Sequence, residues 1–395
     1  MHKNVIMVVF IASLLFPTAI VCQEGEAEPG LRKQPLVRGG VYDKPYLYKL
    51  ATGRAAVGGY AEAHFRFERE AGITEELTFL PKRFNLFMHA LISERFRMAS
   101  ELEFEEGTEE INLELAILDF EIHYSLIFRA GMILTPLGKF NLAHDSPANL
   151  LTDRPLVSTR IIPTALSEPG MGIYGAMYPN AGFRITYEMY AVNGLHEGII
   201  EDSPEGTRIP FGRHNTEDNN NSPAFAGRIG ISPLPEAELG LSWHTGAYNI
   251  SKTEGLTIEE SRNLTILAAD WEYRKNRYLF LGEYARASID IPENFKGTFF
   301  AERQQGFYAQ ACASLFKAML RNLPESYFSG VCRLDWVDFD SELTGDTHSM
   351  LTTGVNFHPT PDSIFKLNYF YSWRRDRFNA ETNSAGILFS VATYF

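Results

Sequence analysis

The sequence lacks an apolar run long enough to cross a membrane as a helix. Its most extended apolar run goes from Val5 to Ile20, which is shorter than the roughly 20 residues that a spanning helix needs. Apolar stripes with helical spacing are also scarce in the rest of the chain. The sequence therefore argues against a bundle of membrane helices.

Basic residues and cysteines are also few. The 36 Lys and Arg residues are outnumbered by 49 Asp and Glu residues, and the resulting net charge of -13 argues against nucleic acid as a partner. Apart from Cys22, only Cys312 and Cys332 remain, as a conceivable cross-strand pair. Period-two alternation places Cys312 on a polar face and Cys332 on an apolar one, which favours free thiols. The ten histidines form no metal-binding pattern, so we predict no metal and no cofactor.

The beginning of the chain has the pattern of a secretory signal peptide, residues 1–22. Lys3 supplies a positive charge, the apolar run follows, and Glu24 and Glu26 come directly after it. Residues 23–56 are rich in Glu, Pro, Gly and Lys, which predicts a flexible periplasmic segment rather than a plug domain. Residues 57–395 then form the main domain.

The main domain alternates in polarity with a period of two residues. From Gly59 to Phe67, small and apolar residues occupy the odd positions, whereas Tyr60, Glu62 and Arg66 are among the even ones. Such segments recur at lengths that suit tilted membrane strands, and the 29 Phe and 18 Tyr residues suit strands and interfacial girdles. The pattern predicts an all-β fold, a transmembrane antiparallel up-and-down β-barrel.

We predict sixteen strands, with 14 or 18 as alternatives. Their ranges are 57–68, 79–92, 95–106, 111–123, 125–135, 170–178, 182–193, 223–232, 236–249, 263–275, 277–289, 304–317, 328–338, 347–358, 363–375 and 384–395. The connections are alternately long and short, beginning with a long outer loop at 69–78. Long outer loops and short periplasmic turns are typical of outer-membrane barrels, so both chain ends should lie on the periplasmic side. A closed sheet of sixteen strands leaves an aqueous lumen.

The C-terminal strand is the sharpest single signal. From Ile387 to Phe395 every second residue is β-branched or aromatic, and the chain ends in an aromatic residue. This strand resembles the terminal strand of outer-membrane barrels. The resemblance implies that Phe395 is part of a signal for the barrel-assembly machinery and that the last strand closes the sheet against the first.

Several short stretches resemble the broad porin family that includes the phosphate-selective porins O and P. They are Ser100-Glu101-Leu102-Glu103-Phe104-Glu105, Leu118-Asp119-Phe120, Arg129-Ala130-Gly131, Pro136-Leu137-Gly138, Asp153-Arg154-Pro155-Leu156-Val157, Arg160-Ile161-Ile162-Pro163-Thr164 and Ala191-Val192-Asn193-Gly194. The likeness covers most of residues 57–395. It implies a sixteen-stranded outer-membrane porin, usually a homotrimer, with a loop folded into the lumen.

The connection 136–169 is the candidate constriction loop. It is the longest connection and the third outer one, and its five prolines would stiffen it. Charges of both signs across a narrow lumen would sort solutes by charge and size. The candidate constriction residues are Lys139, His144, Asp145, Asp153, Arg154, Arg160 and Glu168. The alternative is that they belong to an ordinary surface loop.

The polar faces of the strands supply candidate pore-wall residues. The basic ones are Arg66, Arg97, Arg129, Arg184, Arg228, Arg274, Arg333 and Lys366, and the acidic ones include Glu62, Glu101 and Glu103. A ladder of arginines would favour anions such as phosphate, whereas the interleaved carboxylates could neutralise it. We therefore predict a general or mildly selective pore for small hydrophilic solutes or ions.

Two other functions remain as alternatives to the porin. An adhesin or structural barrel would bind a partner through its loops, and the acidic loop 194–222 keeps this alternative open. A barrel enzyme with a site at the outer rim is disfavoured, because no serine stands in a recognisable nucleophile motif. Such enzymes also resemble small barrels, with fewer strands than the sixteen predicted here. We therefore predict no enzyme activity. We also predict that the protein lies in the outer membrane, in contact with its lipid.

Overall fold

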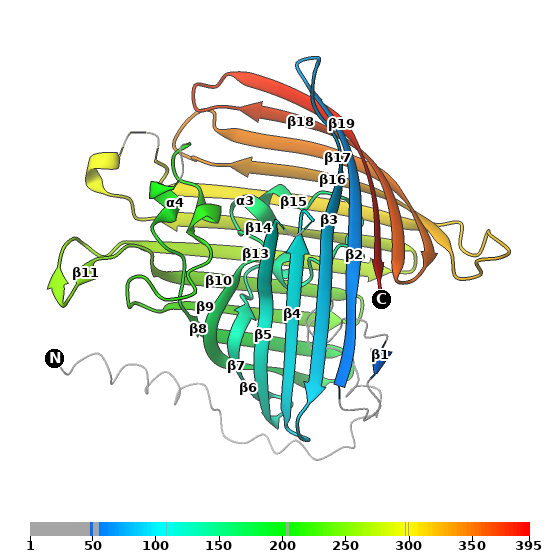
Figure 1. The fold of residues 1–395 in the computed structure, drawn as a ribbon, viewed down its shortest axis with the longest axis horizontal. Coiled ribbons are helices and arrows are strands. Elements are labelled where there is room, and N and C mark those ends of the chain that lie inside the picture. The colour runs from blue at the N-terminus through cyan, green and yellow to red at the C-terminus, as the bar shows by residue number, and fades with distance from the viewer. Residues whose placement is uncertain (1–47, 50–54, 108, 203–204, 297, 299) are drawn as a thin grey trace. The chain divides into compact units, whose positions relative to one another are not determined.

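The computed structural model describes residues 48–49, 55–107, 109–202, 205–296, 298 and 300–395. Sixteen antiparallel strands close into a β-barrel (Figure 1). The predicted signal peptide at 1–22 and most of the predicted periplasmic segment lie outside the described residues. Among the described residues, no helix is both long enough and apolar enough to span a membrane.

The barrel strands follow one another in chain order, and each predicted strand overlaps one of them. They are β2 (Ala55–Glu70), β3 (Ile73–Leu91), β4 (Phe96–Glu105), β5 (Glu110–His123), β6 (Leu126–Leu134), β7 (Ser167–Asn180), β8 (Phe183–Val192), β9 (Ala224–Leu234), β10 (Ala237–Ala247), β13 (Asn263–Lys275), β14 (Tyr278–Ile289), β15 (Arg303–Leu315), β16 (Tyr327–Asp338), β17 (Thr347–Thr360), β18 (Ser363–Arg375) and β19 (Glu381–Tyr394). The predicted sixteen-stranded antiparallel barrel is confirmed.

The last strand closes the sheet against the first. β19 pairs with β2 from Tyr394 opposite Tyr60 to Ser384 opposite Glu70. Phe395 and Gly59 then exchange both backbone hydrogen bonds, at 3.1 and 3.0 Å between N and O. The short strand β1 (Tyr48–Lys49) pairs with the same end of β2. Closure leaves the edge groups of β2 and β19 paired, as a sheet in lipid requires.

The two faces of the sheet differ in polarity as the alternation predicts. On β13, for example, Leu267 faces outward and is 56% exposed, while Asp270 faces inward and is buried. The two cysteines obey the same rule: Cys312 is buried, Cys332 is exposed, and both are free. Since Cys332 is paired with Ala311 rather than with Cys312, the predicted opposition of their faces is confirmed.

The predicted outer loop at 69–78 is wrong. β2 and β3 continue to Glu70 and from Ile73, so only Ala71 and Gly72 form the turn. Both turn residues have positive φ, 47° and 86°, which permits a two-residue hairpin. The charged residues that suggested a loop instead belong to the strands of a long hairpin.

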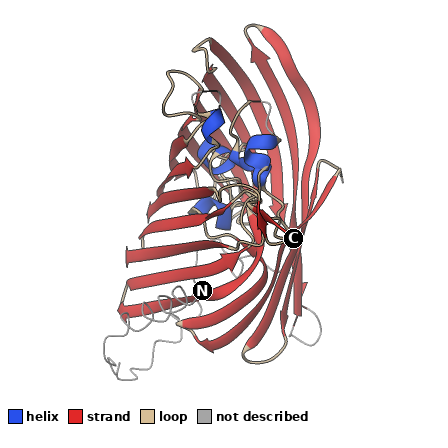
Figure 2. Cartoon of the chain, turned by 90° about the vertical axis from the view of Figure 1, so that its left-hand side faces the viewer, coloured by secondary structure: helices blue, strands red, loops and turns tan. Residues whose placement is uncertain are grey.

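Two long connections fold into the barrel instead of staying outside it. We call residues 135–166, between β6 and β7, the first inner loop, and residues 193–223, between β8 and β9, the second inner loop. They contain α2 (Lys139–Leu142), α3 (Leu156–Arg160), α4 (Gly198–Glu201) and η3 (Ile209–Gly212). Figure 2 shows these short helices enclosed by the strands. Two further elements lie in other connections: the hairpin β11 (Lys252–Thr253) and β12 (Leu256–Thr257), and η4 (Glu293–Phe295).

Candidate functional site

The first inner loop begins by bonding to one side of the barrel wall. Gly138 N donates to Ser242 Oγ on β10 at 2.8 Å. The carboxylate of Glu283 on β14 then accepts from Phe140 N at 3.2 Å and from Ser158 Oγ at 2.8 Å. Gly138 has φ 69°, and a Cβ there would collide with Glu283, so a glycine is required at this position.

Further along, the loop bonds to the neighbouring strands β17 and β18. Lys366 Nζ on β18 donates to Ser146 O at 2.9 Å. Asn356 on β17 donates to Leu150 O at 2.8 Å. The loop is thus held by β10 and β14 at its beginning and by β17 and β18 further along. Its buried polar groups are satisfied at both places.

The returning part of the loop is held by a buried ion pair on β16. Arg333 Nε donates to Asp335 Oδ2 at 2.7 Å, and Arg333 Nη1 donates to the carbonyl oxygen of Asp153 at 2.9 Å. Asp335 Oδ1 in turn accepts from Leu156 N at 3.0 Å. This pair therefore fixes the backbone on both sides of Arg154.

An apolar cluster fills part of the outer half of the lumen. Val157, Ile161 and Ile162 of the first inner loop are fully buried, as are Ile199 and Ile209 of the second. They pack on inward-facing apolar residues of the wall, among them Leu264, Ile266, Ala285, Ala287, Ile289 and Val337. The inner wall is apolar here, because the two inner loops exclude water from these strands and bury their apolar side chains.

Around the inner loops, three of the cavities that are lined by described residues bear on the function. The outer cavity, about 400 Å³, lies between β2, β3, β17, β18 and the first inner loop. The acidic cavity, about 300 Å³, lies between β4, β5 and the second inner loop. The inner cavity, about 440 Å³, lies toward the periplasmic turns of β13–β17. Arg154 lines both the outer and the acidic cavity, and Asp153 lines both the outer and the inner one.

An ion pair therefore stands where the outer and inner cavities approach each other. Arg66 Nη1 on β2 lies 3.0 Å from Asp153 Oδ2 of the first inner loop. Arg66 also contacts Glu68 and Glu76, at 3.1 and 3.0 Å. The side chains of Arg66 and Asp153 are about a quarter exposed, so both remain accessible from the cavities.

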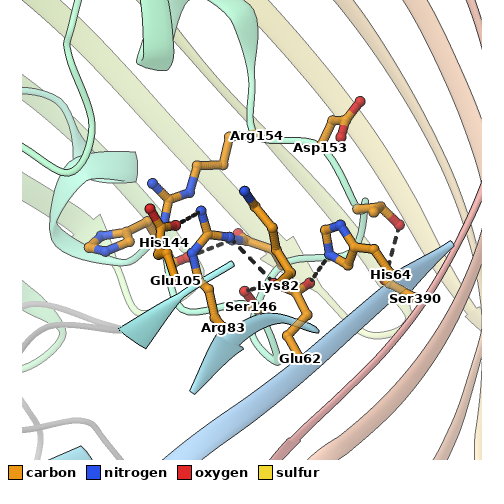
Figure 3. A network of polar contacts seen from close by, with 12 residues as sticks. Glu62, His64, Lys82, Arg83, Glu105, His144, Ser146, Asp153, Arg154 and Ser390 are labelled. Carbon is orange, nitrogen blue, oxygen red and sulfur yellow. Dashed lines mark hydrogen bonds and ion pairs between the residues drawn. The ribbon is translucent and has the colours of Figure 1, made fainter. Parts of the chain in front are cut away.

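A network of charged side chains joins the first inner loop to β2 and β3 (Figure 3). Glu62 accepts from Ser146 Oγ at 2.5 Å and lies 2.7 Å from His64 Nε2. Arg83 lies 3.4 Å from Glu62 and 2.5 Å from Glu105. Because these groups are mutually paired, this part of the loop is held by the wall rather than left mobile.

The other predicted constriction residues are distributed along the loop. Lys139 lies 3.0 Å from Glu272 and 3.4 Å from Glu238. His144 contacts Glu114 on β5, and Asp145 accepts from Tyr394 Oη at 3.1 Å. These contacts place both residues deep in the structure, where they support the loop.

Glu168 lies on β7 instead of in the loop. It is paired with Ile133 of β6 in the sheet register, and it contacts His244 on β10 at 3.1 Å. The predicted loop 136–169 is thus about three residues too long at its end. The prediction placed Pro169 in the loop because proline is rare inside strands. In the structure Pro169 lies in β7, opposite Met132.

Each predicted basic wall residue has a carboxylate partner within 4.0 Å. The shortest contacts are Arg66–Asp153, Arg97–Glu121, Arg129–Asp119, Arg184–Glu238, Arg228–Asp270, Arg274–Glu272, Arg333–Asp335 and Lys366–Glu62. Of the predicted acidic residues, Glu101 accepts from Asn85 and Glu103 pairs with Arg83. The wall is therefore largely neutralised, and a free ladder of arginines is not formed by these residues.

The outer cavity nevertheless has an excess of positive charge. Six basic side chains line it and only three acidic ones. Partial burial, followed by the positive charges of Arg374 and Arg208, lowers the pKa of the Arg160 guanidinium. No ion pair of Arg154, Arg160 or Arg374 is found among the described residues. Sequence analysis missed Arg374, because it stands at the end of a strand beside other charged residues.

Comparisons with known proteins support the same fold. No family model matches the sequence. An uncharacterized protein of Aquifex aeolicus is 26% identical over 372 residues, which cover 86% of this chain and 80% of that protein. The anion-selective porin from Comamonas acidovorans superposes with a TM-score of 0.57 at 10% identity, covering 86% of this chain and 99% of the porin. This chain has the fold of outer-membrane porins.

Two further porin-type barrels resemble it. OprB of Pseudomonas putida has a TM-score of 0.55 at 10% identity and covers 87% of this chain and 94% of its own. The trimer form of OmpT from Vibrio cholerae has a TM-score of 0.52 at 11% identity and covers 87% and 100%. Together with the apolar outer face, the porin fold places the protein in the outer membrane. The narrower likeness to phosphate-selective porins stays a prediction.

Proposed function

We propose that the protein is an outer-membrane porin for passive diffusion of small hydrophilic solutes, with a mild preference for anions. The observation that carries the proposal is the position of Asp153, which borders both the outer and the inner cavity. A solute that enters from outside meets the outer cavity, passes the Arg66–Asp153 pair and leaves through the inner cavity. Charges of opposite sign at this point suit selection by size and charge.

The anion preference rests on charge that the wall does not neutralise. The excess of basic side chains lines the outer cavity, which Arg66 and Asp153 also line, and it would raise the local concentration of anions there. The acidic cavity beside it has the opposite balance, with Glu103, Glu105, Glu110 and Glu114 in its lining. We therefore expect the preference to be mild, and a specific preference for phosphate is the narrower form of the proposal.

Single-channel current in a planar bilayer tests the proposal. The folded protein should give steady ohmic steps, and its reversal potential in a salt gradient should show a modest preference for chloride over potassium. Asp153→Ala should raise the conductance and strengthen the anion preference, because it removes the carboxylate between the two cavities. Glu75→Ala is the matched control, since Glu75 is an exposed carboxylate on the outer hairpin.

The outcomes are distinct. Steady steps that Asp153→Ala enlarges and Glu75→Ala leaves unchanged support the porin and its route. Steady steps that neither variant alters would keep the porin but remove Asp153 from the route. No conductance from folded protein would contradict the porin proposal and favour a structural barrel instead.

We also propose that the barrel assembles as a homotrimer, and that the assembly machinery recognises the last strand with Phe395. The proposal is supported by the trimer form of the similar OmpT barrel. Mass measurement of the detergent-solubilised protein distinguishes one copy from three. Phe395→Ala should lower the amount of folded protein in the membrane without changing the amount synthesised.

A further inference from the structure

The lipid-facing surface carries two arginines near the outer ends of neighbouring strands. Arg286 on β14 and Arg303 on β15 both point outward and are exposed. In the register, Arg286 lies opposite Gln305 and Ser288 lies opposite Arg303. The two arginines are therefore diagonal neighbours on one face, at a separation of about 7–8 Å. Between them lie the hydroxyl of Ser288 and the amide of Gln305.

Aromatic side chains lie directly below this group of donors. Tyr284 precedes Arg286 by two residues on the same face, and its hydroxyl donates to Gln305 Oε1 at 3.1 Å. The rings of Phe307 and Trp336 continue the row at a centroid distance of 5.8 Å. Such a belt marks the boundary between hydrocarbon and headgroups, so the two arginines stand at headgroup level.

The protein compensates the charge of the two arginines only in part. Asp338 Oδ2 on β16 accepts from Gln305 Nε2 at 3.5 Å, but it forms no ion pair with either arginine among the described residues. No ion pair of Arg286 is found in the part of the chain that the structure describes. Arg303 lies 3.8 Å from Glu342, and both side chains are about half exposed. At the membrane interface, an arginine on the lipid face costs little folding free energy. It stabilises the protein there only when an anion binds it. The remaining donors point to an anion from the surrounding leaflet.

We propose that Arg286 and Arg303, with Ser288 and Gln305, form a binding site for the phosphate group of an outer-leaflet lipid. The guanidinium groups would bind the phosphate oxygens through charge-assisted hydrogen bonds. The belt of Tyr284, Phe307 and Trp336 would contact the upper part of the acyl chains. The site lies outside the barrel, so it does not depend on conduction through the lumen.

Lipid retention measured by native mass spectrometry tests this site. The folded protein in mixed micelles is titrated with diphosphorylated lipid A, and in a second series with lipid A from which both phosphates have been removed. The variant is Arg286→Gln with Arg303→Gln. The control is Lys275→Gln with Arg277→Gln, which removes the same charge at the periplasmic end of the neighbouring strands.

The wild type should retain the phosphorylated lipid, and the variant should bind it about 5- to 30-fold more weakly, since each basic residue near a membrane surface contributes on the order of 1 kcal/mol. The control should bind within about twofold of the wild type by the same reasoning. Equal retention by variant and wild type would overturn the proposal, and so would equal retention of the dephosphorylated lipid. Displacement of the lipid by excess inorganic phosphate would show a site for small anions instead.

Folding and conduction provide separate checks. Circular dichroism of the variant should show the same β-sheet signal as the wild type, because both substitutions are on the surface. Single-channel conductance should also stay unchanged. A protein that binds the lipid but does not conduct would contradict the porin proposal and leave the lipid site intact.

Discussion

Replacement of Ile162 by alanine should loosen the first inner loop and make the channel fluctuate. Ile162 is fully buried in the apolar cluster that holds this loop against the wall and against the second inner loop. Removal of a buried isoleucine side chain to alanine typically costs about 2–5 kcal/mol, because contacts are lost and a void remains. This cost falls on the docked state of the loop, since the wall strands have their own hydrogen bonds.

The free-energy loss converts directly into a change in loop population. At about 1.36 kcal/mol for each factor of ten, the ratio of undocked to docked loop should rise by about 30-fold to several thousand-fold. The bonds from Glu283, Asp335 and Lys366 still anchor the loop in its docked state. The barrel itself should stay folded, because its strand pairs do not involve Ile162. Single-channel traces of the variant should then show frequent transitions between conductance levels, whereas wild-type traces should stay steady.

Limited proteolysis gives an independent measurement of the same equilibrium. The variant should be cleaved within residues 135–166 at a rate that rises with the undocked population, because cleavage follows the open form when closing is fast. Leu267→Ala is the control: Leu267 is a large aliphatic side chain on the lipid face of β13 and is 56% exposed. Wild-type traces and cleavage rates for Ile162→Ala would refute the argument that this cluster holds the loop.

Three further predictions concern charge and stability. Arg160→Gln with Arg374→Gln should shift the reversal potential toward cations while conductance changes little, and an unchanged potential would remove these residues from the anion preference. Asp119→Ala should destabilise the barrel by about 3–5 kcal/mol in urea titrations, because it leaves Arg129 buried without its 2.8 Å partner. A loss below about 1 kcal/mol, the level typical of a surface pair, would contradict that burial. Glu283→Gln should keep the barrel folded but raise proteolysis in the first inner loop, whereas Glu75→Ala should keep the barrel folded and leave proteolysis unchanged.

The barrel could be predicted from the sequence because its determinants are local. Alternation along a strand, as in Gly59–Phe67, depends only on the opposite directions of successive side chains, and it recurs in most of the sixteen strands. The inward positions of Arg129, Arg228 and Arg333 follow from the same rule. The turn at Ala71–Gly72 was missed because charged residues occupy strands that extend beyond the apolar belt.

The site was only partly predictable. Residues such as Asp153 and Arg66 could be named, but not their contact, since they are 87 residues apart and meet only when the loop folds into the closed barrel. The apolar residues of the second inner loop, Ile199, Ile200 and Ile209, lie among acidic and polar residues that resemble a surface loop.

The sequence by itself determined the class of fold, the number of strands and the face on which each strand residue lies, because period-two patterning acts within each strand. Only the tertiary structure decided which charges neutralise one another, where the cavities lie and which part of the lumen is filled. Those properties depend on the packing of two long loops against strands distant in the sequence. Such packing is determined by the space inside the closed barrel, which no local pattern describes.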